Sequence, residues 1–199
     1  MPIYLIFFFQ RPCSGRFFLF DIGTKLCYNH LQIMLQKGYG EMITYRKAKP
    51  ADIPTLIELR LGYMHETHDD LEQSVFDEIA DKTKGYFQEH LNRDCVVYLA
   101  EEDGIAAGCV FFLLINKPAS PLFITGKTGT LMNVYTLPQF RRRGIANKLV
   151  SMAIEDGKAW DLSYIELRAT KCGYPLYKQL KFIEDKSIYM SMKLSLTEE

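Results

Sequence analysis

In the second half of the chain, the spacing of hydrophobic residues changes from a strand pattern to a helical one. Thr130–Thr136 is rich in β-branched and aromatic residues, as strands are, and Pro138 cannot continue a ladder. After three arginines and a glycine, apolar residues recur every four positions at Ile145, Leu149 and Ala153, which is the period of an amphipathic helix. The pattern predicts a strand, a basic turn and a helix in direct succession.

The same two patterns predict the other elements. Strands are expected at Ile43–Ala48, Cys95–Glu101, Ile105–Asn116, Tyr164–Ala169 and Ser187–Leu194. Helices are expected to begin at Pro50 and to span Ser74–His90 and Gly173–Leu180, and the polar segment 65–73 is expected to be a loop. The inner stripe of the first helix, or its border, is marked by Ile53, Leu56, Ile57, Arg60 and Tyr63. The order β-α-α-β-β-β-α-β-α-β predicts an α/β (α+β mixed) domain, in which helices flank a central mixed sheet.

Residues 1–41 do not share this regularity. Their apolar runs, Ile3–Phe9 and Phe17–Phe20, are shorter than the roughly 18 to 20 residues of a membrane span. The basic residues follow the first run, whereas they precede the apolar stretch of a secretory signal. We expect residues 1–41 to be a weakly ordered or non-native extension and residues 42–199 to form the folded domain. The alternative is a leader that associates with membranes.

The amino-acid composition limits which kinds of binding partner are expected. The 24 basic and 24 acidic residues cancel, and a general nucleic-acid binder would show a basic excess, so no nucleic acid is expected. Five cysteines form no C-x-x-C pair, which is typical of reduced thiols in a cytoplasmic protein. His65 and His68 are a weak metal cue, and a cluster of solvated polar residues is the more common explanation, so no metal is expected.

The basic turn before the predicted helix is a candidate anion site. The first backbone N–H groups of a helix have no internal partner and lie at the positive end of its dipole. A side chain at Gly144 would hold a phosphate away from the backbone, and the arginines add forked donors. An exposed basic face or a nucleic-acid patch is the alternative. Because the net charge of the chain is zero, the local basic stretch favours a small polyanion.

Two segments taken together resemble the GNAT superfamily of acyl-CoA-dependent N-acetyltransferases. Arg141-Arg142-Arg143-Gly144-Ile145-Ala146 matches the family's acyl-CoA pyrophosphate loop, R/Q-x-x-G-x-G/A, and Leu176-Tyr177 followed by Phe182 resembles its L-Y-x-x-x-G-F segment. The resemblance covers about residues 42–194 and implies a mostly antiparallel sheet. Lys181 stands where many members have glycine, which affects a helix C-cap.

The resemblance implies that an acetyl group passes from acetyl-CoA to a primary amine by direct attack in a ternary complex. A backbone N–H near Asn133–Val134 would polarise the thioester carbonyl. The residues expected to hold acetyl-CoA are Val134, Tyr135, Thr136, Arg141, Arg142, Arg143, Gly144, Ile145, Ala146, Asn147 and Thr170. Thr170 stands where many members have an asparagine, so its particular contact is the least supported of these.

Tyr177 is the expected catalytic residue. A departing thiolate needs a proton, and a tyrosine of pKa ~10 is still protonated where a thiol of pKa ~8.5 begins to ionise. A packing role for Tyr177 is the alternative. The amine must lose a proton as well, and the candidate bases, none of which the spacing selects, are His65, Glu66, His68, Asp69 and Glu101.

The expected partners are acetyl-CoA and an amine acceptor, with a homodimer as a further candidate and no membrane partner. The acceptor itself cannot be deduced from the sequence. A non-catalytic acyl-CoA-binding regulatory domain on the same fold is the alternative function, because fold and site are separable.

Overall fold

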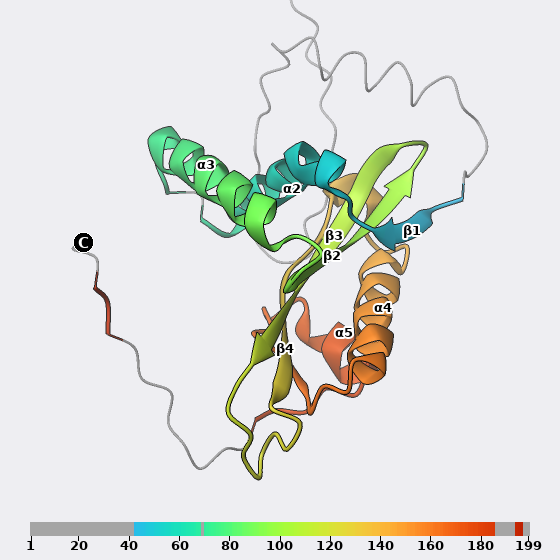
Figure 1. The fold of residues 1–199 in the computed structure, drawn as a ribbon. Coiled ribbons are helices and arrows are strands. Elements are labelled where there is room, and N and C mark those ends of the chain that lie inside the picture. The colour runs from blue at the N-terminus through green and yellow to red at the C-terminus, as the bar shows by residue number, and fades with distance from the viewer. Residues whose placement is uncertain (1–41, 69, 186–193, 197–199) are drawn as a thin grey trace, which may run out of the picture. The chain divides into compact units, whose positions relative to one another are not determined.

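The computed structural model describes residues 42–68, 70–185 and 194–196 (Figure 1). The expected extension 1–41, Asp69 and nearly all of the expected strand Ser187–Leu194 lie outside the described residues. The chain forms two compact units, and the second begins at Ala169.

A five-stranded sheet forms the centre of the first unit. Its strands are β1 (Thr44–Lys47), β2 (Cys95–Glu102), β3 (Ile105–Asn116), β4 (Lys127–Thr136) and β5 (Ile165–Leu167). They lie in the order β1-β2-β3-β4-β5, and only the β4–β5 pair is parallel. The prediction of a mixed, mostly antiparallel sheet is confirmed.

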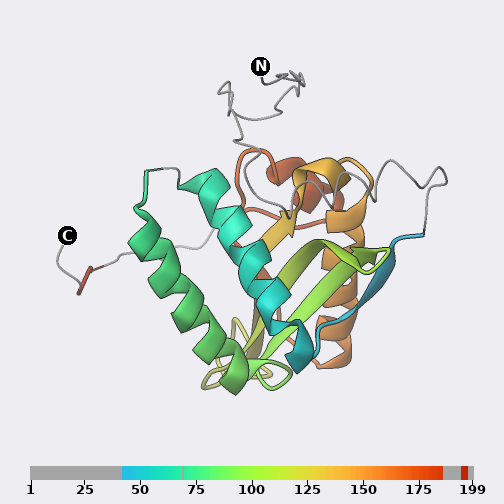
Figure 2. The same ribbon diagram turned by 90° about the horizontal axis from the view of Figure 1, so that it is seen from above.

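Helices cover both faces of this sheet. Figures 1 and 2 show α2 and α3 on one face and α4 on the other. Their bounds are α2 (Ile53–Thr67), α3 (Gln73–His90) and α4 (Ile145–Ala159), and short 3-10 turns, η1 (Pro50–Asp52) and η2 (Pro138–Phe140), precede α2 and α4. The second unit contains α5 (Tyr174–Gln179).

The helix α2 is longer than the sequence suggested. Residues 65–67 were expected to begin a polar loop, but they form the last turn of α2, so this part of the prediction is wrong. The Thr67 hydroxyl donates to the Tyr63 carbonyl at 3.0 Å, a local bond that satisfies a carbonyl near the helix end. The extra turn places Glu66 on a helix rather than on a loop.

Two cores hold the helices to the sheet. On the α2 face, Leu56 and Leu59 pack with strand residues such as Val97, Leu99 and Phe111, and all of them are buried. On the α4 face, the helix contributes four buried apolar residues, which are Ile145, Leu149, Val150 and Ala153. The Tyr98 hydroxyl of β2 also donates to the Asp156 carboxylate of α4 at 2.7 Å. Both faces of the sheet are therefore fixed, which makes the strand ends a rigid platform.

Two cysteines of the described part lie in the sheet. Cys95 and Cys109 are free and buried, and burial raises the pKa of both thiols to about 12. The expectation of reduced thiols is therefore confirmed for Cys95 and Cys109.

Candidate active site

A bulge interrupts β4 where the thioester was expected. The register places Asn133 and Val134 together opposite Val110, so β4 has one residue more than its partner strand. Asn133 has a φ of 49°, a left-handed conformation that non-glycine residues adopt mainly in turns and bulges. Bulges redirect backbone groups away from a regular ladder, and this one lies at the segment predicted to polarise the thioester.

Beyond the bulge, one edge of β4 has no neighbouring strand among the described residues. The parallel ladder with β5 covers Gly129–Leu131 only, whereas β4 continues to Thr136. The Leu137 N–H donates to the Ala107 carbonyl at 2.9 Å, and backbone groups alternate in direction along such a pair. The backbone groups of Val134 and Thr136 therefore face away from β3, where an extended ligand can bond to them as an added strand does.

Thr136 also carries an orphaned polar atom. Its side-chain oxygen is buried and has no hydrogen-bond partner among the described residues, although buried polar groups are normally paired. Its carbonyl accepts a bond from Arg141 Nε at 2.9 Å. The end of β4 thus offers donors and acceptors that suit the amide groups of a pantetheine arm.

The side chain of Tyr135 packs against α2 and does not lie at the free edge of β4. A Cβ on Gly62 would lie 3.2 Å from the Tyr135 hydroxyl oxygen, so the absence of a side chain lets the helix approach the ring. The hydroxyl donates to Glu66 at 2.9 Å. Tyr135 therefore supports the α2 face, and its flanking residues present the free edge.

The loop before α4 has the backbone geometry of an anion site. Gly144 has a φ of 77° and is the N-cap residue, with no side-chain cap bond. A Cβ built on it would meet nothing within 4 Å, so the space beside its backbone is open. Ile145 is buried, and it can therefore contribute only its N–H to a ligand. The free N–H groups of Ile145, Ala146 and Asn147 lie at this helix start.

Two of the three loop arginines are neutralised by glutamates. Arg141 Nη2 lies 2.6 Å from a Glu66 oxygen, and Arg143 Nη1 lies 3.0 Å from a Glu102 oxygen. The hydrogen bond to Arg143 lowers the pKa of Glu102. Arg142 is exposed, with a φ of 63°. The loop therefore offers the backbone at the start of α4 and the exposed Arg142, while Arg141 and Arg143 are paired with glutamates.

A further arginine lies beside the bulge. Arg60 of α2 donates from Nη1 to the Asn133 side-chain oxygen at 3.0 Å. The Asn133 amide nitrogen in turn donates to Cys109 Sγ at 3.5 Å, and Asn133 is only 5% exposed. Burial lowers the pKa of Arg60. The sequence marked Arg60 only as a border residue of a helical stripe, because no local motif distinguishes it from a solvated arginine.

The remaining predicted residues belong to the second unit. Tyr177 is buried on α5, and its ring meets Phe182 edge-on with centroids 5.9 Å apart. Phe182 N–H donates to the Tyr177 carbonyl, and Lys181 N–H to that of Lys178. These two bonds and the left-handed Lys181, with a φ of 66°, form a Schellman motif. Lys181 therefore occupies the left-handed position directly after the C-cap residue Leu180, where many members of the similar family have glycine.

Thr170 supports the start of the same helix. Its side-chain oxygen accepts the Gly173 N–H at 3.1 Å, and its carbonyl accepts the Tyr174 N–H. The residues predicted from the pyrophosphate motif and from β4 thus share the first unit, whereas Thr170 and Tyr177 are fixed within the second.

Of the candidate bases, two carboxylates are committed to arginines. Glu101 binds Arg46 at 2.6 Å, and Glu66 binds Arg141 as described above. Among the residues that the structure describes, no three His, Cys, Asp or Glu side chains form a group that could hold a metal ion. In the same part of the chain, no helix is both long and apolar enough to cross a membrane.

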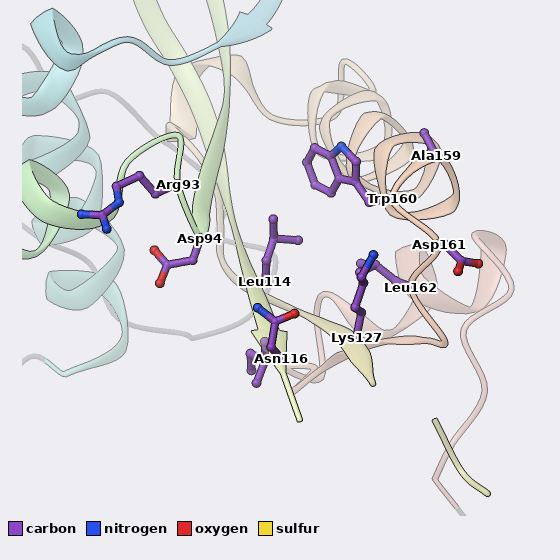
Figure 3. A pocket seen from close by; sticks show the side chains of 10 residues that line it. Arg93, Asp94, Leu114, Asn116, Lys127, Ala159, Trp160, Asp161 and Leu162 are labelled. Carbon is purple, nitrogen blue, oxygen red and sulfur yellow. The ribbon is translucent and has the colours of Figure 1, made fainter. Parts of the chain in front are cut away.

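A cavity of about 470 Å³ lies at a different place (Figure 3). Its walls come from the end of β3, the start of β4, the turn before β2 and the end of α4, and they include Arg93, Asn116, Lys127 and Trp160. None of the predicted site residues lines it. The cavity is therefore separate from the candidate site.

Comparison with known proteins agrees with this geometry. A model of the Acetyltransferase (GNAT) family matches residues 53–182. The chain therefore belongs to the GNAT acetyltransferase family. No curated protein matches the chain significantly.

Solved structures give the same fold. A predicted acetyltransferase from Clostridium acetobutylicum, solved with acetyl-CoA, is 28% identical with a TM-score of 0.67, and the match covers 76% of this chain and 96% of that one. A GCN5-related N-acetyltransferase from Ralstonia eutropha is 20% identical, with a TM-score of 0.65 and coverages of 76% and 99%. Glucosamine-6-phosphate N-acetyltransferase from Arabidopsis thaliana is 23% identical, with a TM-score of 0.57 and coverages of 78% and 100%.

Proposed function

We propose that the protein transfers the acetyl group of acetyl-CoA to a primary amine by direct attack in a ternary complex. The observation that carries the proposal is the bulged, unpaired edge of β4, which leads directly into the open helix start at Gly144. The family membership and the acetyl-CoA bound to the Clostridium relative support the same donor.

The donor would be held mainly by backbone. Val134 and Thr136 would bond to the pantetheine amides through their outward-facing backbone groups. The N–H groups at the start of α4 would bind the pyrophosphate, because several donors and the positive end of the helix dipole meet there. Arg141, Arg142 and Arg143 would add charge, the first and third after exchanging a glutamate for a phosphate. Thr170 remains a candidate for a contact to the arm.

The chemical step forms one bond and breaks another. The amine nitrogen attacks the thioester carbonyl carbon, a backbone N–H at the Asn133–Val134 bulge stabilises the negative oxygen, and the carbon–sulfur bond then breaks. Tyr177 would give its proton to the departing thiolate. The nitrogen loses its own proton to solvent or to a base, so that an amide and a free thiol result.

Substitution of Tyr177 by Phe tests this assignment in the full-length chain. Loss of a general acid is expected to lower kcat by about a hundredfold or more, while the Kd for acetyl-CoA stays within twofold. Thiol release across a panel of amines measures kcat, and calorimetry measures Kd.

Two outcomes would contradict parts of the proposal. An unchanged kcat, under conditions where chemistry limits the rate, removes Tyr177 from the mechanism. If the wild-type chain binds acetyl-CoA tightly yet releases no thiol with any amine, the alternative of a regulatory acyl-CoA-binding domain replaces the enzyme.

A further inference from the structure

Arg60 is a half-buried cation that has no counter-charge in the described part of the chain. Its Nη1 donates a hydrogen bond to the side-chain oxygen of the neutral amide Asn133 at 3.0 Å. Among the described residues no carboxylate pairs with it, and the groups that act on its charge are Tyr63 and Cys109. A guanidinium cannot lose its proton in a protein, and a buried charge is costly unless it is paired. The arrangement is therefore incomplete as it stands.

Two other arginines, Arg46 of β1 and Arg143 of the loop, have acidic partners. Arg46 binds Asp52 and Glu101, and Arg143 binds Glu102, and these carboxylates raise the pKa of both arginines. For Arg60, burial acts first and lowers the pKa. Arg46 and Arg143 therefore have acidic partners, whereas Arg60 has none among the described residues.

The residues around Arg60 do not neutralise its positive charge. Burial raises the pKa of the Cys109 thiol to about 12, so this group is neutral near pH 7. Asn133 uses its side-chain oxygen for Arg60 and its amide nitrogen for Cys109, which fixes the position of the guanidinium. A guanidinium has five N–H donors, and the bond to Asn133 uses one of them.

The helix carries two glutamates, of which Glu58 is exposed and Glu66 is paired. Glu66 accepts bonds from the Tyr135 hydroxyl at 2.9 Å and from Arg141 at 2.6 Å. Its negative charge is therefore balanced by Arg141. An anion that approached Arg60 would meet a positive group and a neutralised ion pair.

The position of Arg60 indicates which group its charge could bind. Asn133 is the bulge residue of β4, where the proposed function places the thioester carbonyl. A group held by Arg60 would lie next to the reacting carbon, on the face of the sheet that α2 covers. The molecule present at that point is the amine acceptor.

We propose that Arg60 binds an anionic oxygen group of the acceptor, so that the substrates are amines that also carry a carboxylate or a phosphate. This assignment rests on the proposed acetyl transfer. Both groups accept two parallel bonds from a guanidinium, and the test separates them.

The test uses matched amines with the full-length protein. Glycine, β-alanine and 4-aminobutyrate represent carboxylates of increasing length, and 2-aminoethyl phosphate represents phosphates. Each is compared with a neutral amine of equal length, and putrescine represents cations. We expect kcat/KM for at least one anionic amine to exceed that of its neutral match by tenfold or more, and the better of the two acid types identifies the natural group.

Substitution of Arg60 by Met should remove this preference. A hydrogen bond to a charged group corresponds to roughly a tenfold to a hundredfold change, so kcat/KM for the anionic amine should fall by that factor and the neutral amine should change little. Arg60→Lys keeps the charge but not the fork, and it should retain part of the preference. Arg93→Gln, which removes a positive charge elsewhere, is the matched control and should leave the preference intact.

A structural role predicts a different result. If Arg60 only positions Asn133, Arg60→Met lowers kcat/KM for anionic and neutral amines by the same factor, and the proposal is overturned. If no amine is acetylated at all, acetyl transfer itself fails, and calorimetric titration of the same amines into the acetyl-CoA complex decides the assignment. Binding of an anionic amine that Arg60→Met weakens by tenfold supports it, whereas equal or absent binding overturns it.

Discussion

The arginines before α4 and Arg60 of α2 are the same residue type in opposite electrostatic states. Arg141 and Arg143 are partly exposed, at 32% and 38%, and each faces a glutamate. Arg60 is half-buried and faces an amide. From exposure alone, Arg60 would be expected to have the acidic partner, since a buried charge needs a partner more than a solvated one does.

The difference indicates what each region would recognise. The loop before α4 can bind an anion through backbone N–H groups, so its arginines are free to form ion pairs when no ligand is present. Arg60 lies in the middle of α2 (Ile53–Thr67), away from the helix start, so an anion beside it would be bound by the guanidinium. We interpret the loop as the donor side and the Arg60 face as the acceptor side, and three changes would break or sharpen this contrast.

The largest expected effect comes from the loop backbone. Gly144→Val forces a β-branched residue into a left-handed conformation, at a cost of roughly 1–2 kcal/mol, and fills the open space beside the helix start. We expect the Kd for acetyl-CoA to rise by tenfold or more, as measured by calorimetry. Arg93→Gln serves again as the control. A Kd within twofold of wild type would show that the pyrophosphate binds elsewhere.

A smaller effect should follow from Glu66→Gln. The substitution leaves Arg141 without its acidic partner. Like Arg60, Arg141 would then face a neutral amide. The Kd for acetyl-CoA should fall a few-fold at low salt, and the difference should shrink as salt screens the charge. A weaker complex would instead mean that Glu66 positions Arg141 for the phosphate rather than competing with it.

The smallest effect concerns stability and pH. Arg143 lowers the pKa of Glu102 below its usual 4.5, and Arg46 lowers that of Asp52 below 3.8. A carboxylate whose folded pKa is depressed stabilises the fold above its unfolded pKa and loses this contribution as the pH falls through the folded value. Unfolding in urea should therefore show a decline in stability below about pH 4.

Arg143→Met isolates one of these pairs. It should cost no more than about 1 kcal/mol at pH 7, and it should reduce the slope of stability against pH in the acidic range. An unchanged slope would show that the pair with Glu102 makes no net contribution. Arg60→Met should not alter that slope, because none of the carboxylates that the structure describes pairs with Arg60.

The strand, the turn and the helix of residues 127–159 could be predicted from the sequence because their signals are local. These elements follow one another, so period and composition are sufficient to recognise them. The family motif then predicted a pyrophosphate-binding role for Gly144, which stays a prediction. The left-handed φ of Asn133 was not predictable, because the bulge depends on the register with β3.

The contacts of Arg60 and Arg141 could not be predicted from the sequence, because they also depend on long-range packing. The bond between Arg60 and Asn133 joins residues 73 positions apart, and that between Arg141 and Glu66 joins residues 75 apart. Such pairs arise from packing, and a single sequence does not record them. The end of α2 was missed because polar residues on an exposed last turn have the composition of a loop.

One competition experiment tests the central claim most directly. The full-length protein is given acetyl-CoA and an equimolar mixture of 4-aminobutyrate, 2-aminoethyl phosphate, their neutral analogues and putrescine, and mass spectrometry measures the acetylated products. The account predicts that an anionic amine is acetylated first by the wild type and loses this advantage with Arg60→Met. Acetylation of the neutral or cationic amines in preference to both anionic ones would contradict it.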